Sequence, residues 1–296
     1  MINWNMISKI MGALLFFEAA LMSLSLGISV YSGEGDTPAF VTSVGLILLA
    51  AIVFRYFGLK AGSRLSRKDA YMVVTLSWVV FSLFGSLPFM LSGYVNNFTD
   101  AFFENMSGFT TTGATVIDDV EALPHGLLFW RSFTQWIGGL GIVFFTVALL
   151  PSLDGGYVKV FSAEITGPIQ TKLHPRLSMG AKYIWMVYVC LTAACAGCYW
   201  IFGMSPWESI NYAMTSTATG GFSIYNDSME NFHSPALEYT CTTFCFLAGI
   251  NFTLLYFTVA RRRIGMLFKS DEFKFYLFMT AACTAVSYTH LRAHET

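Results

Sequence analysis

The sequence predicts an all-α polytopic membrane protein, in which a two-helix hairpin precedes repeated units of helix, re-entrant loop and helix. Three observations predict this fold: a low charge content, a series of long apolar segments, and one loop pattern that occurs twice. Of the 296 residues, 55% are hydrophobic and 12% are charged, whereas about a quarter are charged in a typical soluble domain. The low share of charged residues makes lipid the expected solvent. The formal net charge of −1 gives no excess of basic residues for binding nucleic acid.

Long apolar segments predict the membrane-spanning helices. Crossing the hydrocarbon core takes about 20 mainly apolar residues. The segments that meet this requirement are 7–31, 40–59, 71–94, 127–150, 181–202 and 236–260. A seventh apolar run begins near Phe273.

The distribution of charge predicts how these spans are oriented. Lys and Arg gather in alternate loops, at 60–68, 159–182 and 261–274, whereas the loops between them carry Asp and Glu. Basic loops are retained in the cytoplasm by the positive-inside rule. We therefore expect a multi-pass protein with a cytoplasmic N-terminus.

Two segments on the predicted outer side have an unusual composition. Residues 97–124 and 205–234 each begin with an amphipathic stretch too short to span, and each continues into Thr and Gly. Irregular polar backbone is tolerated at membrane depth only where protein encloses it or where it lines water. Both segments are therefore predicted to be re-entrant loops.

The tips of these loops form an internal repeat when Thr112-Gly113 is aligned with Thr219-Gly220. The flanking spans have the same orientation in both copies, and parallel repeats about an axis along the membrane normal build a central pore. A single Thr-Gly stretch would equally fit close helix packing. Two stretches at matching places favour a pore.

The chemistry of the tips suits a dehydrated cation. Backbone carbonyl oxygens can replace the hydration shell of an ion, glycine permits the backbone turns that align them, and the C-terminal end of a short helix is partly negative. The candidate filter residues are Thr111, Thr112, Gly113, Ala114, Ala218, Thr219, Gly220 and Gly221.

These motifs resemble those of the Trk/Ktr/HKT superfamily of K⁺ transporters. The tips S-G-F-T-T-T-G-A-T at 107–115 and T-A-T-G-G-F-S at 217–223 resemble its first and second filters. The stretches F-W-R-S-F-T-Q-W-I-G-G-L-G-I at 129–142 and F-L-A-G-I-N-F at 246–252 resemble the helices after those filters. The resemblance is strongest to the bacterial Trk membrane subunit and extends to about Val286.

The resemblance implies four pore units in one polypeptide, after two extra helices. On this basis the chain comprises a hairpin at 1–69, a first pore unit at 70–150, a cytoplasmic loop at 151–180, a second pore unit at 181–263, the start of a third unit at 264–286 and a non-native tail at 287–296. The chain is then expected to be a fragment that lacks the third and fourth units.

The resemblance also implies function and partners. It predicts a K⁺ uptake transporter or channel subunit of the bacterial inner membrane, which is no enzyme and needs no cofactor. The transported K⁺ would contact Thr111, Thr112, Gly113, Ala218, Thr219 and Gly220. A homodimer and a cytosolic nucleotide-binding regulatory ring are the implied protein partners. A Na⁺-permeable member of the superfamily and a secondary carrier of an organic solute remain as alternatives, although glycine at Gly113 and Gly220 favours K⁺.

Two charged residues near the first tip are further candidates. Glu104, with Glu208 as a loose counterpart in the second unit, would support the filter backbone or attract cations, or would simply be exposed. Arg131 is expected to point away from the pore axis. Its predicted partners are Asp118, Asp119 and Glu121.

Other residues have structural interpretations. Glu18 and Arg55 are candidates for a buried pair, but their expected depths in the first two helices differ by about two turns, which favours snorkelling of Arg55 to the cytoplasmic face over pairing. Cys195 and Cys198 have C-x-x-C spacing but lie in an apolar helix, so they are expected to pack rather than react. Close helix packing, with a kink as the alternative, is expected at Gly138, Gly139 and Gly141.

Overall fold

The computed structural model describes residues 2–59, 61, 66–141, 177–260 and 265–295. Within these ranges the fold is helical and contains no strand. The elements are α1 (Trp4–Ser32), α2 (Thr37–Phe57), α3 (Arg67–Gly85), α4 (Leu87–Leu91), α5 (Phe98–Phe109), α6 (His125–Gly139), α9 (Leu177–Ile201), α10 (Pro206–Thr217), the 3₁₀ helix η1 (Ser228–Phe232), α11 (Pro235–Ala248), α12 (Phe252–Ala260), α13 (Gly265–Lys269) and α14 (Asp271–Glu295). The all-α fold class is thereby confirmed.

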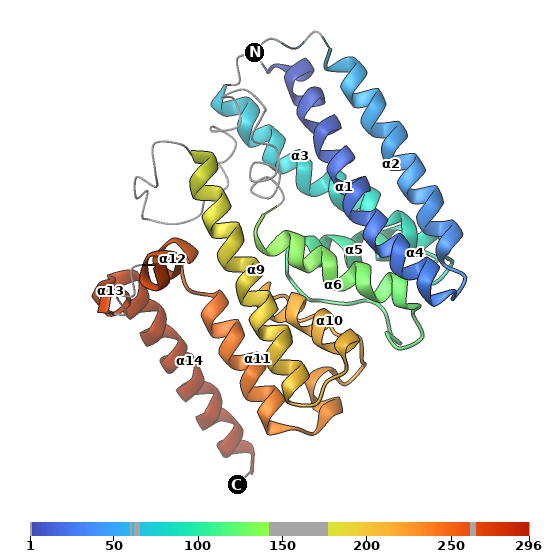
Figure 1. The fold of residues 1–296 in the computed structure, drawn as a ribbon. Helices are drawn as coiled ribbons and strands as arrows, with labels where there is room; N and C mark the ends of the chain where they lie inside the picture. The colour runs from blue at the N-terminus through green and yellow to red at the C-terminus, as the bar shows by residue number, and fades with distance from the viewer. Residues whose placement is uncertain (1, 60, 62–65, 142–176, 261–264, 296) are drawn as a thin grey trace.

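Four helical segments in the described ranges are long and apolar enough to cross a membrane. They are Trp4–Ser32, Thr37–Phe57, Lys68–Leu91 and Tyr183–Ile201. These segments match the predicted first, second, third and fifth spans. In Figure 1 the N-terminus and the beginnings of α3 and α9 lie toward the top, the α1–α2 turn lies at the right, and α11 begins in the lower part.

The N-terminal hairpin is tightly packed and fixes the position of α6. A Cβ added to Gly12 would lie 2.9 Å from both the Ala51 carbonyl oxygen and the Arg55 nitrogen, so α1 and α2 are in close contact. At the turn between them, a Glu34 carboxylate oxygen accepts the His125 backbone N–H (2.6 Å), and the other oxygen lies 2.7 Å from His125 Nδ1. The hairpin therefore holds the first turn of α6.

The expectation that Glu18 and Arg55 lie at different depths and do not pair is confirmed. Glu18 is fully buried, and neither carboxylate oxygen has a hydrogen-bond partner in the described part of the chain, whereas Arg55 is exposed. The hairpin register explains this, because Arg55 lies opposite Gly12. Glu18 is six residues further along α1, about 9 Å deeper at 1.5 Å per residue.

The sixth predicted span, 236–260, is not one continuous helix. It is divided into α11 and α12 by Gly249, Ile250 and Asn251. Tyr276 of α14 donates its hydroxyl to the Phe246 carbonyl oxygen (3.1 Å), which has lost its partner at the helix end. A side chain from another helix thus stabilises the break.

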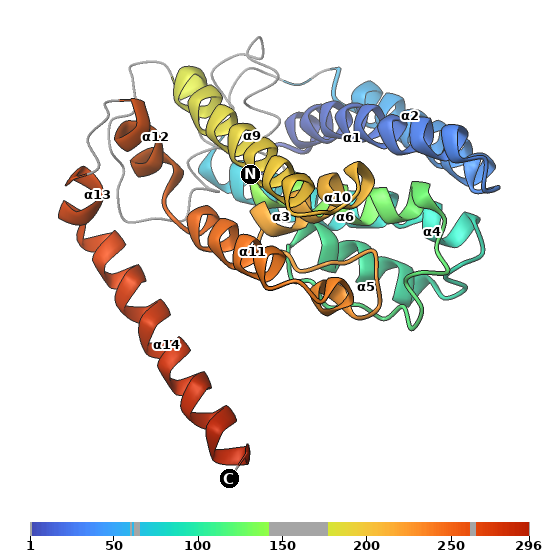
Figure 2. The same cartoon turned by 60° about the horizontal axis from the view of Figure 1, so that its bottom comes forward.

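The fourth span and the C-terminal segment also differ from the predictions. Helix α6 ends at Gly139, and residues 142–150 of the span 127–150 lie outside the described residues, as does most of the predicted loop 151–180. Helix α14 diverges from the other helices and continues through 287–295 without a break (Figure 2). The predicted domain boundaries and the origin of the tail stay predictions.

Candidate functional site

Helices α5 and α10 are half-length helices. Each has 12 residues, which corresponds to about 18 Å and is short of the roughly 30 Å of a hydrocarbon core. Asn97 caps α5 by accepting the Thr99 N–H, and Ser205 forms a capping box with Glu208 at the start of α10. Defined N-terminal caps therefore fix where both short helices begin.

The chain leaves both short helices along the same backbone path. Three successive N–H groups fold back onto carbonyl oxygens of the last helical turn in each copy. These hydrogen bonds are Thr110 to Met106, Thr111 to Gly108 and Thr112 to Ser107 in the first copy, and Ala218 to Met214, Thr219 to Ser216 and Gly220 to Thr215 in the second. Each donor and each acceptor of the first copy has its counterpart 108 residues later in the second copy, as Thr110 has in Ala218.

Unusual backbone angles mark both turns. Thr111 and Thr219 have φ angles of 54° and 53°, and Gly113 and Gly221 have 76° and 83°. A β-branched residue in the left-handed region is a true outlier and costs about 1–3 kcal/mol. Two threonines held this way at equivalent positions indicate a geometry that the surrounding structure imposes.

The predicted register of the repeat was wrong by one residue. Aligning Gly113 with Gly220 separates the copies by 107 residues, whereas the backbone angles and hydrogen bonds repeat at 108. The residue equivalent to Gly113 is therefore Gly221, and Gly220 is equivalent to Thr112. Adjacent glycines in the second tip made the sequence alignment ambiguous, and only the backbone conformation resolves it.

The two turns, which are about a hundred residues apart in sequence, touch each other. A Cβ added to Gly113 would overlap the carbonyl oxygen of Gly220 and would lie 3.6 Å from Gly221 Cα. Thr112, Ala114 and Thr219 are exposed beside this contact, and Thr111 is half-buried. Gly220 and Ala218 are buried, and Ala218 Cα would lie 3.0 Å from a Cβ on Gly139.

Helix α6 packs at close range against α5 and against the end of α3. A Cβ on Gly138 would overlap the Phe109 carbonyl oxygen, and the Trp130 indole donates to the Gly85 carbonyl oxygen at 2.9 Å. The predicted packing role of Gly138 is confirmed. The alternative expectation, a kink at these glycines, applies as well, because the helix ends at Gly139 and Gly141 has a φ of 77°.

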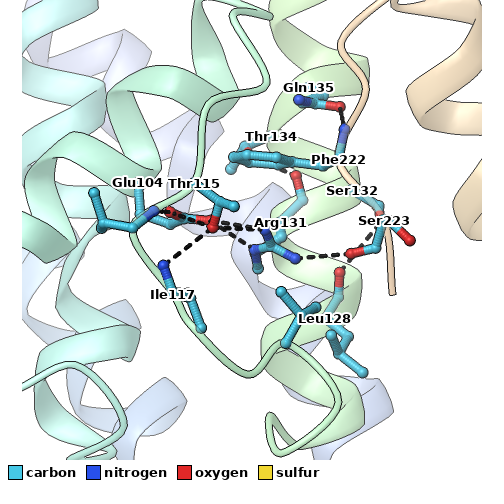
Figure 3. Close-up of polar contacts among 12 residues, drawn as sticks. Glu104, Thr115, Ile117, Leu128, Arg131, Ser132, Thr134, Gln135, Phe222 and Ser223 are labelled. Carbon is cyan, nitrogen blue, oxygen red and sulfur yellow. Dashed lines mark hydrogen bonds and ion pairs between the residues drawn. The ribbon is translucent and has the colours of Figure 1, made fainter. Parts of the chain in front are cut away.

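Glu104 is fully buried and binds the segment that follows the first turn (Figure 3). Its carboxylate accepts hydrogen bonds from the Val116 N–H (3.0 Å) and the Thr115 hydroxyl (3.0 Å). The guanidinium of Arg131 completes this set, with Nε at 2.9 Å and Nη2 at 2.8 Å from one carboxylate oxygen. An exposed Glu104, one of the alternatives, is thereby excluded.

The predicted partners of Arg131 were wrong. Instead of pairing with the acidic loop, Arg131 pairs with Glu104, and its Nη1 donates to the Ser223 carbonyl oxygen at 2.8 Å. Two of the loop acids are engaged elsewhere. Asp119 accepts from the Asn226 side chain and Glu121 from the Asn226 backbone N–H, both at 3.0 Å.

The second unit uses an uncharged residue at the position of Glu104. Tyr212 lies 108 residues after Glu104, and its hydroxyl is 2.6 Å from the Ser223 hydroxyl, just as Glu104 binds Thr115. Glu208 is therefore no counterpart of Glu104. It accepts a hydrogen bond from the Tyr225 hydroxyl (2.6 Å), and this bond raises the pKa of Tyr225 to about 12.

Residues outside the predicted set contribute to the site. Gln135 Oε1 accepts the Phe222 N–H at 3.1 Å, and the ring of Phe222 lies 4.3 Å from the guanidinium carbon of Arg131. The spacing of Arg131 and Gln135, four residues apart on a helix, indicates a shared polar face. That spacing was the available signal, but the partners of this face come from a distant segment.

Comparison with known proteins agrees with this architecture. The sequence model of the TrkH family, described as a cation transport protein, matches residues 40–287. The Trk system potassium uptake protein TrkH of Vibrio parahaemolyticus is 35% identical over 298 residues, covering 99% of this chain and 61% of that protein. TrkH of Escherichia coli K12 is 32% identical over 294 residues, covering 97% and 61%.

A solved structure is similar in fold. The crystal structure of the potassium transporter TrkH from Vibrio parahaemolyticus superposes with a TM-score of 0.84 at 32% identity, covering 99% of this chain and 60% of that one. The chain thus spans about three-fifths of the length of these relatives. Family model, relatives and fold agree, and the chain belongs to the TrkH family of cation transport proteins.

Proposed function

We propose that this chain forms part of a K⁺ uptake transporter, and that K⁺ passes beside the two turns that meet at Gly113 and Gly220. The observation that carries the proposal is the contact between two turns with the same left-handed backbone geometry. The ion itself is suggested by the relatives, which are named potassium uptake proteins.

Carbonyl oxygens of the two turns would replace the hydration shell of the ion. The residues proposed to contribute are Thr111, Thr112, Gly113 and Ala114 in the first turn and Ala218, Thr219, Gly220 and Gly221 in the second. Helices α5 and α10 end at these turns, so their partly negative C-terminal ends favour a cation there. Glu104 would support the first turn by holding the chain at Val116.

We propose that the glycines of the two turns give the pore its selectivity for K⁺ over Na⁺. Gly113 and its structural equivalent Gly221 both have positive φ angles, so a side chain at either position would strain the turn. The family match gives no support to a carrier of organic solutes.

The remaining length of the relatives leaves room for further pore units that would complete a ring of carbonyl oxygens. We also propose the inner membrane of a bacterium, a cytoplasmic N-terminus, a homodimer and a cytosolic nucleotide-binding regulatory ring. These four proposals follow from the sequence pattern and the family resemblance.

Replacing Gly113 by Ser tests the filter assignment. A K⁺-uptake-deficient bacterium that expresses the full-length protein should grow at low K⁺. Gly113→Ser should reduce the ratio of K⁺ to Na⁺ uptake about tenfold or more, because the added side chain overlaps the Gly220 carbonyl oxygen.

Gly93→Ser is the matched control. Gly93 has a φ of 77° against 76° for Gly113, but a Cβ there would meet nothing within 4 Å. Both variants therefore introduce a side chain at the same kind of backbone angle, and only Gly113→Ser disturbs the second turn. Equal ion selectivity in the two variants would contradict the proposal.

A further inference from the structure

We propose that Arg131 and Gln135 are positioning residues that fix the two filter turns relative to each other, and that this sets the discrimination between K⁺ and Na⁺. The inference rests on the proposed function and assigns a role to the face of α6 that carries these side chains. Neither residue contacts the turns 111–114 or 218–221 through a hydrogen bond within the described ranges. Arg131 acts on the chain that follows the turns, and Gln135 does so while its side-chain amide also packs against Gly220 of the second turn.

The first argument is topological. Helix α6 follows the first turn in sequence, yet Arg131 and Gln135 both reach the segment after the second turn (Figure 3). Arg131 donates to the Ser223 carbonyl oxygen at 2.8 Å, and Gln135 accepts the Phe222 N–H at 3.1 Å. The Phe222 N–H and the Ser223 carbonyl oxygen, on successive residues, are both bound to α6. These two hydrogen bonds prevent the segment from sliding along the helix.

The second argument is that one guanidinium serves both units. Its Nε and Nη2 bind Glu104, which holds Thr115 and Val116 just after the first turn. Its Nη1 binds Ser223, just after the second. The planar fork of arginine can satisfy two partners in fixed directions, which the single ammonium group of lysine cannot do.

The third argument comes from comparing the two units. Tyr212 braces Ser223 with a neutral hydroxyl, so holding one loop requires no ion pair. The Glu104–Arg131 pair has side chains only 0% and 2% exposed, and a buried ion pair is often replaceable by apolar residues without loss of stability. What the charged pair adds here is the connection from one unit to the next.

The charge balance allows this arrangement beside a cation path. An isolated arginine would repel the permeating ion, but Glu104 neutralises Arg131 at hydrogen-bond distance. The ring of Phe222, 3% exposed, covers the guanidinium at 4.3 Å from its centroid.

Arg131→Lys is the informative variant, because it keeps the charge and removes the fork. We expect K⁺ uptake to persist while the K⁺/Na⁺ uptake ratio falls about tenfold or more, as for loss of a hydrogen bond to a charged group. Gln135→Met, which changes no charge, should lower the same ratio about threefold or more by releasing the Phe222 N–H. An unchanged ratio in both variants at normal membrane level would overturn the inference.

A charge-neutral pair of substitutions separates folding from positioning. Glu104→Gln combined with Arg131→Met leaves no unpaired buried charge, so the protein should accumulate better than with Arg131→Met alone. Selectivity should nevertheless stay low, because the link to Ser223 is gone. Wild-type selectivity in this double variant would show that the link is dispensable.

The outcomes distinguish this inference from the proposed function. If the unsubstituted protein neither takes up K⁺ nor prefers it to Na⁺, the proposed function fails. If it is selective and the ratio ignores both Arg131→Lys and Gln135→Met, only the positioning role fails. Should Arg131→Lys not accumulate, Gln135→Met decides the question, because it leaves the ion pair intact.

Discussion

Removing the charge of Glu104 should destabilise the protein far more than removing the charge of Glu208. Glu104→Gln keeps the shape of the side chain but leaves the Arg131 guanidinium, 2% exposed, without its counter-ion. Stranding one member of a buried ion pair costs about 3–5 kcal/mol. This corresponds to roughly 150- to 5,000-fold in the equilibrium between folded and opened states.

Glu208→Gln is the matched control for this prediction. Glu208 accepts hydrogen bonds from the Tyr225 hydroxyl and from Ser205, at 2.6 Å in both cases, but it faces no cation among the described residues. Its replacement should cost about 1 kcal/mol. Wild-type and variant proteins would be compared in detergent by the fraction that remains monodisperse on size-exclusion chromatography after heating.

The prediction is tested by the melting midpoints of the two variants in this assay. The Glu104→Gln midpoint should lie several degrees below that of Glu208→Gln. If both variants melt together, or if Glu104→Gln matches the wild type, the guanidinium does not depend on Glu104 and the proposed network is incorrect.

Two further predictions concern backbone contacts elsewhere in the fold. Gly138→Ala should lower the same melting midpoint, because its Cβ would overlap a carbonyl oxygen at the end of α5, whereas Gly197→Ala, with nothing within 4 Å, should leave it equal or higher; a fall of equal size in both variants would refute the close approach. Tyr276→Phe should cost about 1 kcal/mol by leaving the Phe246 carbonyl oxygen at the α11–α12 break without its donor, and an unchanged midpoint would show that the break needs no support from α14.

The fold was largely predictable from the sequence, because apolar length and alternating loop charge are local properties. The break between α11 and α12 was missed, since the apolar run 236–260 conceals it and the supporting Tyr276 comes from another helix. The separation of Glu18 from Arg55, by contrast, was predicted from their depths in the first two helices, and the alignment of α1 with α2 agrees with it.

The candidate site was only partly predictable. The Thr-Gly composition located both turns, but the register error at Gly220 arose because the alignment matched letters, whereas the backbone angles repeat at Gly221. Arg131 was recognised as unusual, but its partners were missed. Glu104 and Ser223 meet it only when the two units pack together.

The position of Arg131 and Gln135 on a single helix has a mechanical consequence. Helix α6 is held at its first turn by Glu34 and ends at Gly139, just before Gly141 with its positive φ angle. It is therefore anchored at one end, at its first turn. A tilt of α6 about its first turn would move the segments after both turns in the same direction, so the spacing between the two turns would be preserved.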